Sequence, residues 1–572
     1  MSEYDFRALG LVAGLEIHQQ LDTETKLFCD CPTERRDPAE AVRTFTRYLH
    51  PTRSELGEID EAALEESRVD REFEYLAYDT TCLVEEDDEP PHRLDVEALD
   101  VALEIAQLMD MTTLDQAHVM RKIVIDGSNT SGFQRTTLIA KDGVIETDHG
   151  AVSIDDLMLE EESAQRITDT ETGVRYSLDR LGIPLVEIGT GPDIRSPEQA
   201  REAAEHIGML LRSTGAVKRG LGTIRQDVNV SIAEGARVEL KGVQRLDDID
   251  DIVRFEVDRQ TALLDIADAL EDREAAVGTP MDVTGVLEGT DSAVVGDVLE
   301  SGGTVQAVPL LGFAGLVGRE VQPDRRLGTE LSDHAKRHGA GGIFHSDELP
   351  AYGVSSAEVE ALREELDIGD NDAFAFVAAD RDTARAAIEA VADRARGAIS
   401  GVPEETRGAN DDGTSRYLRP LPGAARMYPE TDVPPVELDV SQVEMPELLV
   451  DKVDRYADQY GLDAGLAEQV AYSPQMPLFE YAVQKGVDPN LAARTIENTV
   501  IELRRDDVPI DRVSDSQFRG VFDLVAEGQI AQEGIPELLR GLAEDPSATA
   551  DTVADRRGLG AAGAGVIRGV VE

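Results

Sequence analysis

Two segments between Ser177 and Gln244 decide the fold: SLDRLGIPLVEIGTGPDIRSPEQA (177–200) and RGLGTIRQDVNVSIAEGARVELKGVQ (219–244). In the second segment, polar side chains occupy every other position, at Thr223, Arg225, Asp227, Asn229 and Ser231. Because successive side chains of a strand point to opposite faces, these residues share one face. After a turn at 233–236 the alternation resumes with Arg237, Glu239 and Lys241. The segment therefore predicts a hairpin with one polar face.

This polar face has two interpretations. One face of an antiparallel sheet is often solvated, and solvation explains the charges without any function. Glu187, however, lies inside the otherwise apolar strand PLVEI, where a carboxylate needs a partner. Its position favours a functional face, with solvation as the alternative.

The composition indicates an acidic protein of several domains. At 572 residues, the length predicts about three or four domains. The formal net charge is -60, and lysine occurs at only eight positions. This balance argues against a nucleic-acid partner, so local basic clusters carry more weight than the total. Because the acids are spread along the whole chain, we interpret them as an adaptation to a very salty cytoplasm.

Cysteine usage and the N-terminus favour a cytoplasmic protein without a membrane anchor. Cys29, Cys31 and Cys82 are too few for a disulfide framework, and MSEYDFRALG does not have the pattern of a signal peptide. No segment approaches the roughly 18 consecutive apolar residues of a membrane span. The cysteines are either unpaired thiols or part of a zinc site with His50 or His92, although the four-ligand spacing is incomplete.

The strand predicted at Leu11–Leu21 carries the first candidate metal ligands. Glu16 and His18 are two residues apart and therefore point to the same face, as a pair of ligands would. A solvated strand face without a metal is the alternative.

A loop of small residues follows the strand predicted at Lys122–Asp126. In RKIVIDGSNTSGFQRT (121–136), residues such as Ser128 let backbone N–H groups approach an anion, and Arg121 and Lys122 supply positive charge. The spacing is not that of a P-loop. The segment predicts either a phosphate cradle or an ordinary polar hairpin.

Helices are predicted on either side of these strands. Helical periodicity covers 58–68 and 96–109, with an acidic loop at 85–91 between them. A further helix is predicted at 197–214, because Ser196 suits the N-cap and a proline follows it.

Three consecutive acids, Glu160, Glu161 and Glu162, follow an apolar run. An acidic run in such a chain is usually a solvated face. A site in which carboxylates are needed is the alternative.

The character of the sequence changes near Gly278. The segment up to about residue 400 predicts a self-contained α+β unit with a helix near 383–397. The next segment, 401–438, is rich in proline and glycine and predicts a long loop. It contains a local basic cluster of Arg407, Arg416, Arg419 and Arg426. From Glu444 onward the pattern is helical, with a boundary near 507–514.

Taken in order, seven motifs resemble the GatB/GatE family, and its archaeal branch in particular. They are LEIHQQL (15–21), KIVIDGSNTSGFQRT (122–136), LEEESA (159–164), SLDRLGIPLVEI (177–188), GTIRQDVNVSI (222–232), RVELKGVQ (237–244) and RPLPGAARMYPETD (419–432). The resemblance covers essentially the full length.

The resemblance implies an α+β multidomain fold. An antiparallel-sheet catalytic cradle would comprise 1–272 and 401–440, split by an insertion domain at 273–400 that is similar to the extra domain of bacterial aspartyl-tRNA synthetases. Helical C-terminal domains would follow at 441–510 and 511–572, the last resembling the YqeY family. Both would suit the binding of tRNA.

The resemblance also implies a ligase that amidates glutamate esterified to tRNA(Gln). ATP would phosphorylate the γ-carboxylate, and ammonia would displace phosphate to give glutaminyl-tRNA. Mg²⁺ and cationic side chains would neutralise the charge that passes between two anionic groups. Mn²⁺ is a second option, because imidazole is an unusual Mg²⁺ ligand.

Motif matching assigns these roles to residues. The metal ligands would be His18, Glu161 and Glu187. Glu16 would lie beside them, and Glu160 is the alternative to Glu161. The related B subunit has a histidine where this chain has Met158, which removes one ligand. The candidates for phosphate and second-metal contacts are Arg121, Lys122, Ser128, Arg180, Arg225, Asp227 and Lys241. Some relatives carry a cysteine-rich zinc site nearby, but the pattern here is incomplete.

No serine or cysteine constellation for releasing ammonia from glutamine stands out in the sequence. The resemblance implies that ammonia comes from a partner, the asparaginase-like D subunit of the amidotransferase, in a heteromer that would be a heterotetramer. The alternatives are a non-catalytic tRNA-binding module that recruits an enzyme, and a carboxylate–amine ligase for small molecules. The carboxylate-rich motifs argue against the first, and the insertion and helical third argue against the second. We also expect the arginines to be concentrated where tRNA binds.

Overall fold

The computed structural model describes residues 4–49, 72–170, 173–421 and 427–560. The helix predicted at 58–68, the candidate zinc ligand His50 and the basic residue Arg426 lie outside these ranges. Within them, no helix combines the length and the apolar character needed to cross a membrane.

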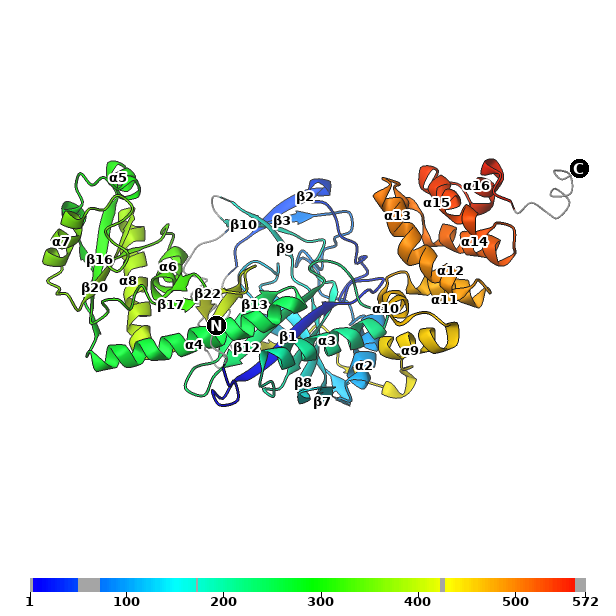
Figure 1. The fold of residues 1–572 in the computed structure, drawn as a ribbon, viewed down its shortest axis with the longest axis horizontal. Coiled ribbons are helices and arrows are strands. Elements are labelled where there is room, and N and C mark those ends of the chain that lie inside the picture. Colours follow the sequence, from blue (N-terminus) through cyan, green and yellow to red (C-terminus); the bar gives the residue numbers. More distant parts are fainter. Residues whose placement is uncertain (1–3, 50–71, 171–172, 422–426, 561–572) are drawn as a thin grey trace, which may run out of the picture. The chain divides into compact units, whose positions relative to one another are not determined.

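The chain forms two compact units. The first contains residues 1–208 and 216–445, and the second contains 209–215 and 446–572. Figure 1 labels many of the elements of both.

The first unit is built on a sheet of eleven strands. From one edge the order is β22 (Ser415–Pro420), β21 (Glu405–Ala409), β13 (Val238–Val243), β12 (Ile224–Ser231), β1 (Val12–Gln20), β11 (Pro184–Thr190), β8 (Gly150–Glu161), β7 (Phe133–Thr147), β6 (Val119–Ile123) and β23 (Met427–Pro429). β4 (Thr112–Thr113) pairs with β7 at the side. Only the β13–β21 pair of this sheet runs parallel. The predicted antiparallel-sheet, α+β character is confirmed.

The hairpin predicted from the alternating segment is present as β12 and β13. Asn229 lies opposite Glu239 and Val228 lies opposite Leu240. Val228 and Leu240 are both fully buried, so the apolar face of the hairpin enters the core and the polar face points away from it.

The helices predicted at 96–109 and 197–214 are present as α2 (Val96–Leu108) and α3 (Pro197–Ser213). The backbone N–H of Gln199 donates to the Ser196 hydroxyl at 3.2 Å, which is the predicted N-cap. α2 packs against β7 and β8, and α4 (Ile249–Asp272) packs against β12.

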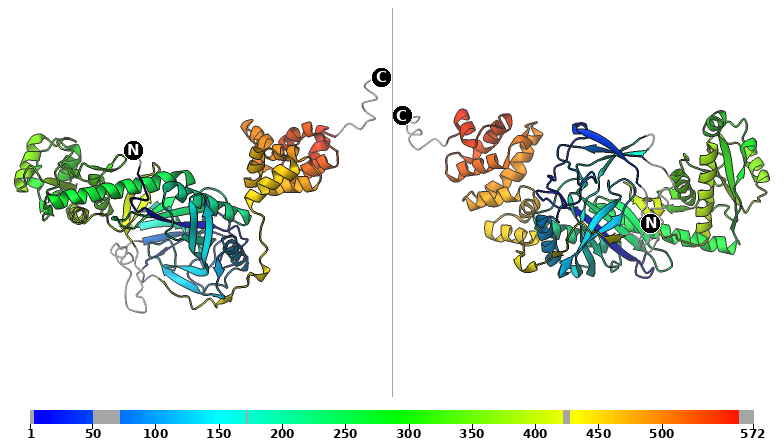
Figure 2. Two further views of the ribbon diagram at one scale, coloured as in Figure 1. Left: turned by 60° about the horizontal axis from the view of Figure 1, so that its bottom comes forward. Right: turned by 180° about the vertical axis from the view of Figure 1, so that it is seen from behind.

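A small second sheet lies beside the main sheet in Figure 1 and in the right-hand view of Figure 2. Its order is β2 (Arg43–Arg47), β3 (Glu72–Ala77), β10 (Gly173–Ser177) and β9 (Gln165–Asp169). A short pair, β5 (Gln116–Ala117) with β24 (Val436–Glu437), completes this part of the unit.

The inserted segment, residues 276–399, forms an α+β layer structure. Its sheet has the order β14 (Ala276–Val277), β16 (Thr304–Leu311), β20 (Ala373–Ala379) and β19 (Phe344–His345), with β15 (Met281–Asp282) beside β16. Its other elements are α5 (Ala293–Glu300), β17 (Glu320–Gln322), β18 (Arg325–Arg326), α6 (Leu327–Arg337), α7 (Ser356–Glu365) and α8 (Arg381–Ile399). Alternate residues of β16 and β20 enter two different hydrophobic clusters, one on each face of the sheet. The helix predicted near 383–397 is confirmed as α8.

Three interpretations of the sequence are wrong. Segment 401–438 is not only a loop, because it supplies β21 and β22, and Arg407 is fully buried rather than part of a basic surface. The strand predicted at Lys122–Asp126 lies three residues earlier, as β6. The acidic run 160–162 is not a solvated face, because all three residues are at most 6% exposed.

The second unit is helical, as predicted for this region. Its helices are α9 (Leu449–Tyr460), α10 (Ala464–Tyr472), α11 (Met476–Gln484), α12 (Pro489–Arg494), α13 (Val500–Arg505), α14 (Asp515–Ala526), α15 (Ile535–Glu544) and α16 (Ala550–Arg557), with a π-helical turn at Thr495–Thr499 between α12 and α13. One hydrophobic cluster runs from Tyr456 to Ala554 and includes residues from both sides of the predicted boundary at 510/511.

Candidate active site

The polar face of the main sheet gathers charged side chains from its central strands. On β1, His18 lies opposite Glu187 of β11 and opposite Arg225 of β12. Glu16, two residues earlier, lies opposite Asp227 of β12. Because directly opposed residues project from the same face, strand register alone brings these five side chains together.

Glu16, His18 and Glu187 form what we call the first group. The Nε2 atom of His18 lies 3.1 Å from Oε2 of Glu187 and 3.4 Å from Oε1 of Glu16. Burial and the charge of Glu187 raise the pKa of Glu16 to about 7. Burial opposes a charged imidazole, but the hydrogen bond to Glu187 and the nearby carboxylates raise the pKa of His18. Ligand atoms of the three residues all lie within 4.8 Å of one another, as a shared cation would require.

Lys122 of β6 neutralises two carboxylates of the site. Its Nζ donates to Glu187 Oε2 at 3.1 Å and to Glu160 Oε1 at 3.2 Å. Burial alone would lower the pKa of this amine, yet Glu160 and Glu187 raise it above its ordinary value. Burial alone would raise the pKa of Glu187, but Lys122 and His18 hold it well below its ordinary value.

The three acids at 160–162 point to different partners. Glu160 faces Lys122 and also accepts from Gln134 Nε2 at 2.9 Å. Glu161 points to the other face of β8, where its Oε1 accepts from the backbone N–H of Arg135 at 2.9 Å. Glu162 accepts from Arg225 Nη2 at 2.9 Å. The structure therefore brings Glu160, not Glu161, to the first group, because adjacent strand residues point in opposite directions.

A second group consists of Glu16, Asp227 and Glu239, whose carboxylates also lie within 4.8 Å of one another. Lys241 Nζ bridges two of them, at 2.6 Å from Asp227 Oδ2 and 2.8 Å from Glu239 Oε1. Glu16 belongs to both groups and therefore joins them into one continuous site.

The other predicted phosphate contacts have partners outside these groups. Arg121 points away from Lys122 and binds Glu430, at 2.8 and 2.6 Å. The Ser128 N–H donates to the Asp126 carboxylate at 2.9 Å. The Arg180 guanidinium donates to the backbone oxygen of Ser163 at 2.8 Å. The structure does not bring Arg121 or Ser128 to the first group.

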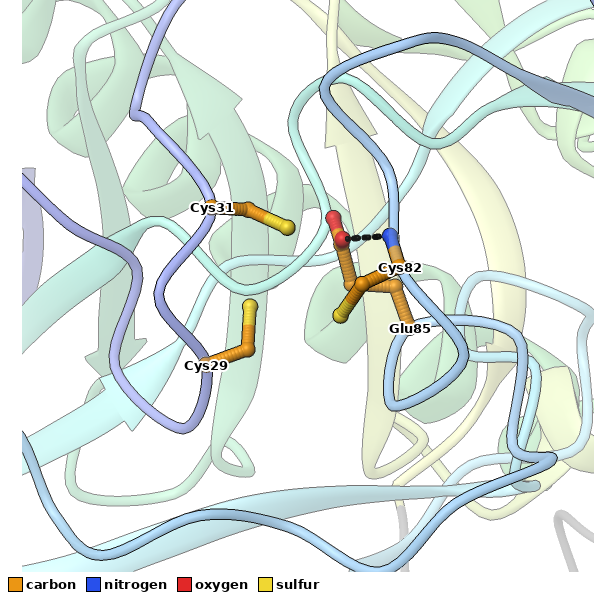
Figure 3. Close-up of side chains that lie close together, drawn as sticks. All are labelled: Cys29, Cys31, Cys82 and Glu85. Atoms are coloured by element: carbon orange, nitrogen blue, oxygen red, sulfur yellow. Dashed lines mark hydrogen bonds between the residues drawn. The ribbon is translucent and has the colours of Figure 1, made fainter.

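The three cysteines lie together on neighbouring loops (Figure 3). The thiols of Cys29, Cys31 and Cys82 and the carboxylate of Glu85 all lie within 4.8 Å of one another. Glu85 Oε2 accepts from the Cys82 backbone N–H at 2.8 Å, and its other oxygen pairs with Lys26. Hydrogen bonds from Cys29 and Cys31 lower the pKa of the Cys82 thiol. The fourth polar group of this cluster is Glu85, which sequence spacing did not identify.

The candidate zinc ligand His92 borders the cysteine loop, where its backbone N–H donates to the Phe28 oxygen at 2.9 Å, but it is not one of these four groups. Its Nδ1 is 3.6 Å from the Asp30 carboxylate, and its side chain is 44% exposed.

Comparison with known proteins assigns the fold and this site to a family. The model of the GatB/GatE catalytic domain matches residues 11–444, more than half of the chain and all of the site. The chain belongs to the GatB/GatE family. A second model, the GatB domain, matches residues 477–572.

Relatives of this GatB/GatE chain are similar along its whole length. A protein from Halobacterium salinarum is 70% identical over 576 residues, covering 100% of this chain and 93% of its own. A protein from Haloarcula marismortui is 69% identical, covering 100% and 92%. A protein from Methanosarcina barkeri is 54% identical, covering 98% and 90%. Each of the three is named as the E subunit of glutamyl-tRNA(Gln) amidotransferase.

Within the GatB/GatE catalytic domain, the two groups place carboxylates and an imidazole on one sheet, with the amines of Lys122 and Lys241 beside them. Carboxylate oxygens are the ligands that Mg²⁺ prefers, and the amines suit phosphate oxygens. Sequence reasoning missed Glu239, although it lies two residues before Lys241 on the predicted polar face. No local pattern pointed to Thr406, whose hydroxyl donates to Glu239 Oε2 at 2.7 Å.

Proposed function

We propose that this chain is the amidating subunit of a tRNA-dependent amidotransferase and acts on glutamate esterified to tRNA(Gln). A γ-carboxylate oxygen of the substrate attacks the γ-phosphorus of ATP, and ADP leaves. Ammonia then attacks the acyl phosphate, phosphate leaves, and a proton is released to give glutaminyl-tRNA. The observation that supports this proposal is the joined pair of carboxylate groups, with their amines, on the catalytic domain of the family.

The residues of the first group fit a divalent cation. His18, Glu187 and Glu16 would hold Mg²⁺ or Mn²⁺, with Glu160 as a further carboxylate in place of Glu161. The second group, with Asp227 and Glu239, would hold a second cation. A bound cation supplies charge neutralisation for phosphoryl transfer between two anionic groups.

The cationic side chains of the site would also neutralise negative charge during phosphoryl transfer, because they carry permanent positive charges. Lys122 and Lys241 are held by carboxylates on opposite sides of Glu16, and each is more than half buried. Arg225, which is tied to Glu162, is 30% exposed at its side chain and reaches the same face. We propose that these three side chains orient the phosphates of ATP.

Ammonia would come from a partner. The relatives are each named as one subunit of an amidotransferase, which supports a second subunit as the source of ammonia. We propose that the asparaginase-like D subunit of the amidotransferase supplies it, in a heterotetramer that works in the cytoplasm on charged tRNA(Gln).

The test is amidation without the partner. Purified chain is incubated in molar KCl with ATP, Mg²⁺, concentrated ammonium and glutamyl-tRNA(Gln), and glutaminyl-tRNA and ADP are quantified. We expect both products to form, in equal amounts, and to require every component.

Two results would contradict the proposal. Binding of the tRNA without any product would support a non-catalytic tRNA-binding module instead. Rapid hydrolysis of glutamine by the chain alone would contradict the division of labour between the two proteins.

The cysteine cluster fits a structural zinc ion. Three thiols and one carboxylate, from two loops that are far apart in the sequence, give four ligands, the number of closed zinc sites. We propose that zinc at Cys29, Cys31, Cys82 and Glu85 ties these loops together.

Metal analysis checks the zinc site. After dialysis, the wild-type chain should retain one equivalent of zinc by mass spectrometry, and the Cys31→Ser variant should lose it, because a hydroxyl is a poor zinc ligand. Cys31 is partly exposed, so this variant leaves the core packing intact. Metal-free wild-type protein with three thiols that react with a thiol reagent in the folded state would refute the assignment.

A further inference from the structure

Strand β21 has two different environments on its two faces. It follows the inserted segment in the chain and pairs in parallel with β13, so that Glu239 lies opposite Thr406 and Leu240 lies opposite Arg407. Glu405 and Arg407 point to one face, and Thr406 points to the other. All three are at most 2% exposed.

The face with Glu405 and Arg407 is held by a buried ion-pair network. Arg407 contacts Glu330 of α6 at 2.8 Å and also pairs with Glu405. Arg259 of α4 contacts Glu330 at 2.8 Å and pairs with Glu405 as well. Arg394 of α8 contacts the other oxygen of Glu330 at 2.8 Å. Elements of the inserted segment therefore fix the position of β21.

The face with Thr406 points toward the active site. Its hydroxyl donates to Oε2 of Glu239 at 2.7 Å, and the other oxygen of Glu239 lies 2.8 Å from Lys241. Both oxygens of Glu239 are thus held in place, one by an amine and one by a hydroxyl. The Glu239 carboxylate in turn lies within reach of Glu16 and Asp227.

We propose that Thr406 is a positioning residue for the second group: its hydroxyl orients Glu239 for a divalent cation, and the inserted segment holds Thr406 in place through β21. This inference rests on the proposed function, because it deepens the assignment of that site. It gives the insertion a role in the chemistry in addition to any role in binding tRNA.

The physical reason is the geometry that a cation demands of its ligands. A carboxylate held only by Lys241 can rotate about its last torsion toward the amine. The Thr406 hydroxyl opposes this rotation and keeps one oxygen lone pair directed toward Glu16 and Asp227. Loss of such an outer partner of a metal ligand typically weakens metal binding by about 10- to 100-fold.

The test compares Thr406→Val, Thr406→Ser and Thr137→Val. Valine has the shape of threonine without its hydroxyl, and serine restores the hydroxyl. Thr137 is an equally buried threonine of the same sheet, and its hydroxyl has no hydrogen-bond partner among the residues that the structure describes, so Thr137→Val is the matched control. The full chain is titrated with Mn²⁺ in molar KCl, with and without ATP, and binding is followed by electron paramagnetic resonance. Ammonium-driven amidation is then measured against Mg²⁺ concentration.

We expect Thr406→Val to weaken one class of Mn²⁺ sites by at least about tenfold, and to shift the Mg²⁺ requirement of amidation upward with a smaller change in kcat. Thr406→Ser should have the Mn²⁺ affinity and the Mg²⁺ requirement of the wild type, and Thr137→Val should leave both quantities unchanged. Equal Mn²⁺ affinity of Thr406→Val and wild type would overturn the inference. Absence of Mn²⁺ binding by the wild type would instead refute the proposed function and the inference together, so the two failures are distinguishable.

Discussion

The Glu187→Gln variant is expected to lose at least about 100-fold of its ammonium-driven amidation, while it binds tRNA as the wild type does. Glu187 is the carboxylate on which His18 and Lys122 converge, at 3.1 Å each. A glutamine amide has one acceptor oxygen and no charge, so it does not balance Lys122 and binds a divalent cation far more weakly than a carboxylate does. Quantification of glutaminyl-tRNA formation and of Mn²⁺ affinity checks both consequences.

The control for Glu187→Gln is Glu146→Gln, which makes the same chemical change at an exposed position of β7 in the same sheet. It should amidate at the wild-type rate. Amide formation by Glu187→Gln at a rate close to that of the wild type would contradict the assignment of the first group as a cation site.

The second large effect is expected for the Glu330→Gln variant, in the stability of the folded protein. Glu330 is 1% exposed and accepts from Arg259, Arg394 and Arg407. Burial alone would raise the pKa of Glu330, but these guanidinium groups hold it well below its ordinary value. Glu330→Gln leaves one positive charge uncompensated in the core, and removal of one member of a buried ion pair typically costs about 3–5 kcal/mol. We expect a loss of that size in the free energy of unfolding, measured by urea denaturation.

The contribution of Glu330 to the free energy of unfolding should depend on pH in a definite direction. Because the folded-state pKa of Glu330 is lowered, its charge stabilises the protein above the unfolded-state value near 4.5 and ceases to do so as pH falls through the folded-state pKa. The difference between wild type and Glu330→Gln should therefore be constant near neutrality and shrink in acid. Added salt should change it little, since buried pairs are weakly screened.

Glu389→Gln is the control for the stability prediction, because Glu389 is exposed on α8 of the same inserted segment. Such a surface change should stay within about 0.5 kcal/mol of wild type. If Glu330→Gln also stayed within that range, the buried network would not be what holds β21 to α6 and α8.

Amino-acid composition does not predict where in the fold the arginines lie. We expected them where tRNA binds, because the chain has a net charge of -60 and few lysines. That expectation stays a prediction, but two of the arginines, Arg259 and Arg407, are fully buried and pair with glutamates of the inserted segment and the main sheet. Composition gives the number of charged residues, but only the three-dimensional fold shows which of them are exposed to solvent.

Local patterns were sufficient for features that depend on neighbours in the chain. The alternation at 223–231 and 237–241 predicted β12 and β13 and their polar face, because strand periodicity is a property of the backbone. The spacing of Glu16 and His18 placed both on one face for the same reason. The cap at Ser196 marked the start of α3, because the first N–H groups of a helix need a nearby acceptor.

Tertiary structure alone decided which distant residues complete the site. The choice between Glu160 and Glu161 depended on which face of β8 meets Lys122, and the fourth group at the cysteines came from Glu85 on another loop. Thr406 reaches Glu239 only because β21 returns after the whole insertion to pair with β13. The sequence by itself determined the faces of the strands, since these follow from short-range periodicity. The pairing of strands determined the site, since contacts between residues more than 160 positions apart are set by packing and leave no local pattern.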